Sequence, residues 1–226
     1  MKQSKNINNG FRRTAGPGLA AILLLSGLFS SCFGVNLDIS LNENGSGTIT
    51  LEYKISRSLD NLGKLDGNER WNTIPVGKAD FERSLDRLPD IKLISFSSNE
   101  TNDDLVIRAK MEFQKLSGLF SFLDARGGKS SFSGEKEKGI ITINLSEPGN
   151  FDNQHLLKLI TEISRNYEVA LSMSFPAEGT MRVFDTAGKP LSPDREYTAK
   201  GKKVSCIFSL SEVLTSANGI NVEMAW

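Results

Sequence analysis

The chain has 226 residues, with 27 basic and 27 acidic side chains, one histidine and two cysteines. Residues 1–31 hold four of the basic side chains and none of the acidic ones, so the rest carries 23 basic against 27 acidic side chains. This slightly acidic balance argues against a nucleic-acid partner, since no Lys/Arg-rich stripe interleaved with aromatics offsets it. The single histidine and the two cysteines also exclude a histidine-rich metal site and a thiolate cluster.

The first 32 residues have the organisation of an export signal. A basic start is followed by an apolar run over residues 19–29, then by two serines and Cys32. As a helix the run is about 16 Å long, too short for a hydrocarbon core of roughly 30 Å. Gly16-Pro17-Gly18 also prevents its extension backwards. We therefore predict a signal peptide over residues 1–31 and no membrane span.

The end of this segment resembles the lipobox of bacterial lipoprotein signals, in which a leucine, a small or branched residue and a glycine or alanine precede a cysteine. Leu28 lies four residues before Cys32, Phe29 lies three before it, and serines fill the small positions. The bulky Phe29 departs from this pattern, and in this respect the segment resembles the relaxed lipoboxes of spirochaetes. The resemblance implies cleavage between Ser31 and Cys32, a thioether-linked diacylglycerol on Cys32, and acylation of the new amino group, as with palmitate.

A lipid on Cys32 would hold the protein on a membrane of the cell envelope, because two or more acyl chains anchor stably. Phe33 after the cysteine is no acidic retention signal, so the outer membrane is slightly favoured if sorting follows the Gram-negative habit. Exposure to the periplasm or to the cell surface stays open. The alternative is a secreted protein cut nearby, with Cys32 a free thiol or paired with Cys206.

Alternating apolar positions after the cysteine predict an α+β fold, namely an antiparallel sheet built from successive hairpins with helices packed on one face. Residues 32–36 are expected to form the lipidated cysteine and a short tether, and residues 37–226 the exported domain. The clearest element is a hairpin with strands over 35–42 and 47–56, since Asn44-Gly45 separates two runs of period 2.

Helices and further hairpins follow along the chain, with boundaries set by the apolar spacing and by turn-forming residues. The predicted elements are a short helix over 59–65, a helix over 78–88, strands over 91–96 and 105–113, a helix over 115–123, strands over 129–134 and 139–145, a helix over 152–165, a hairpin of strands 167–175 and 179–184, a strand over 202–209, a helix over 210–217 and a strand over 220–226. Helix followed by hairpin thus occurs twice, which leaves open two α-β-β-containing halves, about 37–146 and 147–226.

The organisation of the chain resembles bacterial lipoproteins related to the LppM family. The likeness rests on the signal with its cysteine, on the Asn44-Gly-Ser-Gly47 hairpin with the strand Thr48–Tyr53, and on a closing strand that ends at Trp226. It implies an α+β domain of the cell envelope and no known chemistry. We expect Trp226 to hold the last strand in the sheet.

Two short motifs look chemical, but a turn explains each of them better. Asn42–Tyr53 has the oxygen and glycine positions of a calcium loop, yet a tyrosine stands where the bidentate glutamate should be and strands flank it. Gly127-Gly-Lys-Ser130 has the tail of a phosphate loop, but the required first glycine would fall at Leu123. We predict a hairpin turn for the first motif and a flexible turn for the second.

Single residues are weighed in the same way. His155 lies on the flank of a predicted helix, without a serine or cysteine nucleophile motif to work with, so a surface position is expected. Cys206 shares a strand face with Val204 and Phe208, which predicts a small buried core residue. Trp71 follows a charged loop and is a candidate interaction residue, although core packing is the better expectation.

Carboxylates are the remaining route to catalysis. The closest pairs lie in polar turns or at strand starts, where nothing indicates the burial that a working acid–base pair needs. These pairs are Asp103/Asp104, Glu135/Glu137 and Asp194/Glu196.

The sequence therefore predicts a non-enzymatic envelope lipoprotein without cofactor or metal. It is held on a membrane by Cys32 and acts as a structural or interaction module toward an envelope protein, lipid or glycan. The alternative is a lipoprotein that binds a small apolar ligand or a lipid.

Overall fold

The computed structural model of the protein describes residues 33–56, 75–102, 104–123, 130–134, 138–146, 158, 161, 162, 164, 167–193 and 196–226. The export signal and the helix predicted over 59–65 lie outside these residues, as does most of the helix predicted over 152–165. Residues 31–226 form one compact unit.

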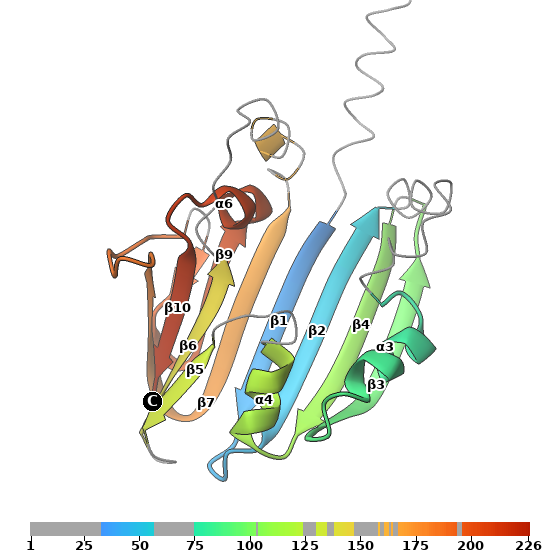
Figure 1. Cartoon of the computed structure of the whole chain (residues 1–226), viewed down its shortest axis with the longest axis horizontal. Helices are drawn as coiled ribbons and strands as arrows, with labels where there is room; N and C mark the ends of the chain where they lie inside the picture. Colours follow the sequence, from blue (N-terminus) through green and yellow to red (C-terminus); the bar gives the residue numbers. More distant parts are fainter. Residues whose placement is uncertain are drawn as a thin grey trace, which may run out of the picture. The chain divides into compact units, whose positions relative to one another are not determined.

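Within the described part of the chain, ten strands form one mixed sheet (Figure 1). Along its main path the strand order is β3-β4-β2-β1-β7-β10-β6-β5, while β9 pairs with β7 and β8. The strands are β1 Phe33–Leu41, β2 Gly47–Ser56, β3 Ile91–Glu100, β4 Asp104–Phe113, β5 Ser131–Gly134, β6 Gly139–Ser146, β7 Glu168–Phe184, β8 Glu196–Thr198, β9 Lys200–Ser209 and β10 Ile220–Ala225.

The predicted fold class is correct in part. Strands predominate, the helices are minor, and the sheet curls into a half-barrel. The sheet is also not the purely antiparallel succession of hairpins that was predicted, because β1 and β7 pair in parallel. The helices that the structure describes from end to end are α3 Lys78–Leu85, α4 Leu116–Leu123 and α6 Leu210–Thr215. Of these, α3 and α4 lie over the same face of the sheet (Figure 1).

The first hairpin forms as predicted, with β1 and β2 joined by a tight turn. Gly45 adopts φ +82°, which a glycine tolerates without strain, and the Asn44 side-chain oxygen accepts the backbone N–H of Ser46 at 3.0 Å. The strand nevertheless begins earlier than expected, since Phe33 pairs with Ile55. Residues 33–36 are thus part of the sheet and not a tether, because β2 is long enough to satisfy their backbone groups.

Two other predicted hairpins, and the helix before the first of them, are present with small shifts. The strands β3 and β4 pair antiparallel, with a bulge at Ile94, and β5 pairs antiparallel with β6. The helix α3 ends at Leu85 instead of 88, and the Leu88 N–H donates to the Leu85 carbonyl at 2.7 Å in the turn before Pro89. Its Phe81 packs against Phe96 of β3, with ring centroids 5.7 Å apart.

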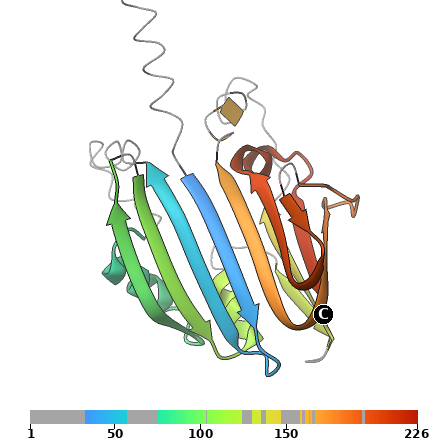
Figure 2. The ribbon, with the colours of Figure 1, turned by 180° about the vertical axis from the view of Figure 1, so that it is seen from behind.

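The largest departure from the predicted elements is β7. Residues 167–175 and 179–184 were expected to form a hairpin, but residues 168–184 form one strand of 17 residues. Its first part pairs with β1 and β9, and its last part with β10. The register with β9 shifts between Ser174 and Gly179, around Pro176, so these turn-forming residues bend a continuous strand (Figure 2). The second helix–hairpin unit therefore lacks its hairpin.

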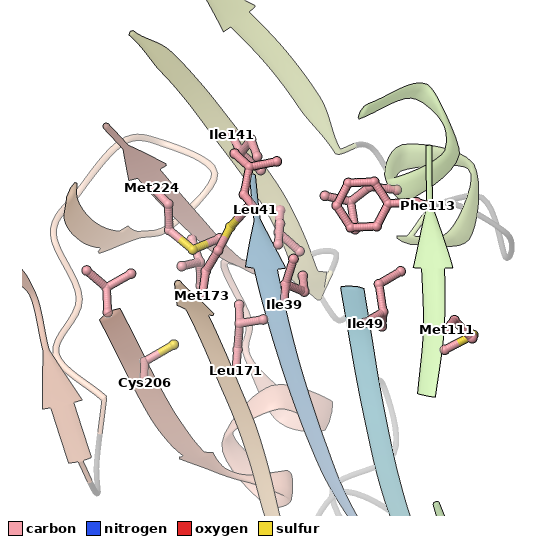
Figure 3. Packing of buried hydrophobic residues seen from close by; sticks show 14 of the residues in the cluster. Ile39, Leu41, Ile49, Met111, Phe113, Ile141, Leu171, Met173, Cys206 and Met224 are labelled. Atoms are coloured by element: carbon pink, nitrogen blue, oxygen red, sulfur yellow. The ribbon is translucent and has the colours of Figure 1, made fainter. Parts of the chain in front are cut away.

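The curl brings the two parts of the sheet together around one core. In Figure 3, Met224 of β10 and Ile141 of β6 lie close to Leu41 of β1 and Met173 of β7. The last residue, Trp226, stacks on Phe175 and Phe132 with ring centroids 5.2 and 6.0 Å apart. Its backbone exchanges two hydrogen bonds of 3.1 Å with Gly139, so it holds the last strand in the sheet as predicted.

Candidate functional site

One broad face of the sheet is polar, and no helix of the described residues lies over five of its strands (Figure 2). In Figure 2 the strands β3, β4, β2, β1 and β7 lie side by side with no helix in front of them. Side chains on this face alternate with the core residues, and the registers align them in rows across six strands, about 24 Å wide. We call the following residues the polar face: Asn36, Asp38, Ser40, Thr48, Thr50, Glu52, Lys92, Ser95, Ser97, Arg108, Lys110, Glu112, Ala170, Ser172, Ser174, Lys203, Ser205 and Ile207.

A network across three strands marks the centre of the polar face. The carboxylate of Asp38 on β1 accepts hydrogen bonds at Oδ2 from the Ser172 hydroxyl, at 2.6 Å, and from the Lys203 ammonium. Ser172 is buried, whereas 57% of the Lys203 side chain is exposed. An ion pair this exposed contributes about 0–1 kcal/mol to stability. The network therefore orients side chains across β1, β7 and β9 more than it stabilises the fold.

The same geometry argues against serine chemistry at this point. An activated serine must give its proton to a neighbouring base, such as a neutral lysine amine. Here Ser172 and Lys203 both donate to the same oxygen of Asp38, so neither acts as the base for the other. Among the described residues, no group of three or more His, Cys, Asp or Glu side chains could hold a metal ion.

Two arginine–glutamate ion pairs also join neighbouring strands. Arg108 of β4 donates through Nε to Glu52 of β2 at 2.6 Å, within the polar face. Arg182 of β7 makes two parallel hydrogen bonds of 2.6 and 2.8 Å with Glu223 of β10, which raise the pKa of Arg182. The Arg182 guanidinium also lies 5.1 Å from the centre of the Phe184 ring. Both pairs join adjacent strands, so we assign them the structural role of holding these strands side by side.

The inner face of the sheet offers a second, apolar surface. Most of its side chains are fully buried, as Ile39 and Ile49 are. Val35, Leu37 and Leu51 in the same rows are only partly buried. We call these three residues the apolar strip. Val35 lies in the first half of β1, and Leu37 and its register partner Leu51 lie at the middle of β1 and β2.

The residues named from the sequence as candidates have different outcomes. Cys206 is fully buried with a free thiol, which confirms the predicted core position. Asn42–Ser46 forms the predicted hairpin turn, with the Asn42 N–H donating to the Ser46 carbonyl at 2.8 Å. The following lie outside the described residues, and their predictions stay predictions: Ser31, Cys32, Trp71, His155, residues 127–129 and at least one member of each carboxylate pair.

The sequence alone does not predict the polar face, although the side-chain alternation on two of its strands is visible in the sequence. The alternation in residues 35–56 shows which side chains leave the core on β1 and β2. Ser172 and Lys203 come next to Asp38 only through the parallel β1–β7 pair and the β7–β9 pair. These contacts join residues more than 130 positions apart, for which no local pattern exists.

The thiol of Cys206 gives a first testable prediction. Burial raises its pKa from an ordinary value of 9.0 to about 12, so the thiol stays protonated and inaccessible in the folded protein. In a Cys32→Ser protein, where Cys206 is the single cysteine, we expect no reaction with an aromatic disulfide reagent at pH 8 and full reaction in urea. Stability should also fall as the pH rises above about 9, because the unfolded chain then loses the thiol proton first. Rapid labelling of the native protein would contradict the buried position.

Comparisons with known proteins leave the family open. No protein-family model matches the chain, and no curated protein matches it. Among solved structures, the chain is similar to the folded domain of the LppM protein of Mycobacterium tuberculosis, determined by NMR. The two are 13% identical, with a TM-score of 0.44, and the match covers 87% of this chain and 90% of the other. In the described part of the chain, no helix is both long enough and apolar enough to cross a membrane.

Proposed function

We propose that the protein is a non-enzymatic lipoprotein of the cell envelope, anchored through Cys32, whose sheet domain contacts another envelope component. The observation that carries this proposal is the polar face. It spans six strands, no helix lies over five of them (β3, β4, β2, β1 and β7) in Figure 2, and its side chains are hydroxyls, charges and one amide apart from Ala170 and Ile207.

The short side chains at the centre of the polar face support this proposal further. Serines and threonines such as Ser40, Thr50 and Ser174 leave the strands accessible to a flat partner, while the charges of Asp38 and Lys203 are already paired. A polar protein surface or a glycan fits the polar face better than an apolar partner does. The serine and lysine geometry described above gives no support to an enzyme.

Anchoring and contact can be tested in the same cells. We expect the wild-type chain to fractionate with membranes and to label with palmitate, and Cys32→Ser to do neither, because the thioether needs the cysteine sulfur. A photo-crosslinking residue at Thr50, on the polar face, should then capture a partner, whereas the same residue at the exposed Ser133 of β5 should not. Equal capture at the two positions, or membrane retention and palmitate labelling of Cys32→Ser, would count against the proposal.

A second function, binding of a small apolar ligand or lipid, is favoured by the apolar strip. Val35, Leu37 and Leu51 are partly exposed on a face where most other residues are buried. Extraction of Cys32→Ser protein purified without detergent separates the two functions. Stoichiometric lipid in the extract, which is lost when Leu51 is replaced by Asn, supports the ligand function.

A further inference from the structure

We propose that the end of the sheet that carries α6 lies against the lipid bilayer, with Leu214 in the interfacial region. This inference rests on the proposed function, because it takes Cys32 as the lipidated residue. It adds an orientation for the domain and a second, non-covalent contact with lipid.

No spacer separates the proposed anchor Cys32 from the sheet. Cys32 is followed directly by Phe33, the first residue of β1. Consecutive Cα atoms lie about 3.8 Å apart, so a lipidated Cys32 places the start of β1 within a few ångströms of the headgroup region. A flexible linker would let the domain rotate freely above the membrane, but β1 is held in the sheet from its first residue by β2.

The strand registers show which other parts of the domain lie at this level. Val169 of β7 is opposite Val35 of β1, so Glu168 lies at the level of Gly34, and Ser209 of β9 is opposite Glu168. The helix α6 begins at the next residue, two strands from β1, or about 10 Å across the sheet. Figures 1 and 2 both show α6 at the same end of the sheet as the start of β1.

The side chain that meets the bilayer in this orientation is Leu214. It is 46% exposed, more than the other large apolar side chains that are exposed in the described part of the chain, which are Ile94, Ile140 and Tyr197. The turn after α6 adds a second exposed position at Ala217. An exposed leucine near the end of a helix, followed by an exposed alanine in the next turn, suits a shallow position among lipid headgroups.

The charges at this end indicate an apolar contact and not an electrostatic one. The described ionisable side chains there include Lys54, Glu100, Asp104, Glu168, Glu196 and Glu212, at the ends of β2, β3, β4, β7 and β8 and in α6. They carry more negative than positive charge, whereas attraction to anionic lipids needs clustered lysines and arginines. We therefore expect the contact to form on uncharged phosphatidylcholine and not to strengthen with anionic lipid.

Fluorescence on vesicles tests the orientation. The full lipidated protein is reconstituted in phosphatidylcholine vesicles with an environment-sensitive dye on Leu214→Cys, and with Ala217→Cys as a second reading. Glu43→Cys is the matched control, because Glu43 is exposed in the hairpin turn at the other end of β1, about 30 Å away. Cys206 is fully buried, so we expect it not to react in the folded protein.

We expect dyes at 214 and 217 to shift to shorter wavelength and to be quenched by lipid-attached quenchers at least threefold more than the dye at 43. Vesicle flotation of the same samples separates two failures. If the protein does not float, Cys32 anchoring fails and the orientation fails with it. If the protein floats but quenching at 214 and 217 is no greater than at 43, the anchor stands and the orientation is overturned.

Discussion

Replacement of Phe113 by alanine should lower the free energy of unfolding by about 3–5 kcal/mol. Phe113 is fully buried at the end of β4, and its ring fills the space above the backbone of Gly47 on β2. A Cβ atom at position 47 would lie 2.4 Å from the Phe113 ring, which shows how closely ring and backbone pack. The backbone of β2 is fixed by β1 and β4 on its two sides, so the cavity left by Phe113→Ala cannot close.

Urea unfolding followed by circular dichroism measures this loss. The control is Ile94→Ala on the neighbouring strand β3, which removes an apolar side chain that is 44% exposed and should cost less than about 0.5 kcal/mol. A loss below about 1.5 kcal/mol for Phe113→Ala would show that the site collapses or that the ring is not in the core.

The elements that the sequence predicts well are those whose partners lie next to them in the chain. The β1–β2 hairpin follows from alternation around Asn44-Gly45, and the burial of Cys206 follows from its place between Val204 and Phe208 on one strand face. In each case the information lies within about twenty residues, where side-chain period and turn chemistry decide the structure.

The elements that the sequence does not predict depend on distant pairing. Pro176 and Gly179 have the composition of a reverse turn, yet β9 continues past them on the same edge and keeps β7 as one bent strand. The parallel pairing of β1 with β7, and with it the polar face, has no local signature at all. The strand β8 has three residues, Glu196–Thr198, which is too short for a period to be visible.

One consequence of the distant pairing concerns the anchor. β1 is an interior strand, flanked by β2 on one side and β7 on the other. A lipidated Cys32 is therefore joined to the middle of the sheet and not to an edge strand that could peel away. The polar face and the proposed bilayer contact then keep a fixed orientation, which an anchor on a flexible tail would not give.

Replacement of Trp226 by alanine should lower the free energy of unfolding by about 2–4 kcal/mol, somewhat less than for a fully buried aromatic residue. The ring stacks on Phe175 from β7 and Phe132 from β5 and thereby joins both parts of the curled sheet. Its loss leaves these two rings without a partner between them. The two backbone hydrogen bonds with Gly139 do not depend on the indole and should persist.

Gly139 makes this prediction specific. A Cβ atom there would lie 2.5 Å from the Trp226 ring and 2.6 Å from Phe132, so Gly139→Ala alone should cost about 1–3 kcal/mol. In the Trp226→Ala background the new methyl group enters space that the indole has left. The double variant should therefore lose less stability than the sum of the two single variants, by about 0.5–3 kcal/mol in a urea-unfolding cycle. Strict additivity would mean that the Trp226 ring does not pack on Gly139, and the last strand would then be held by its backbone pairing with β6 and β7 alone.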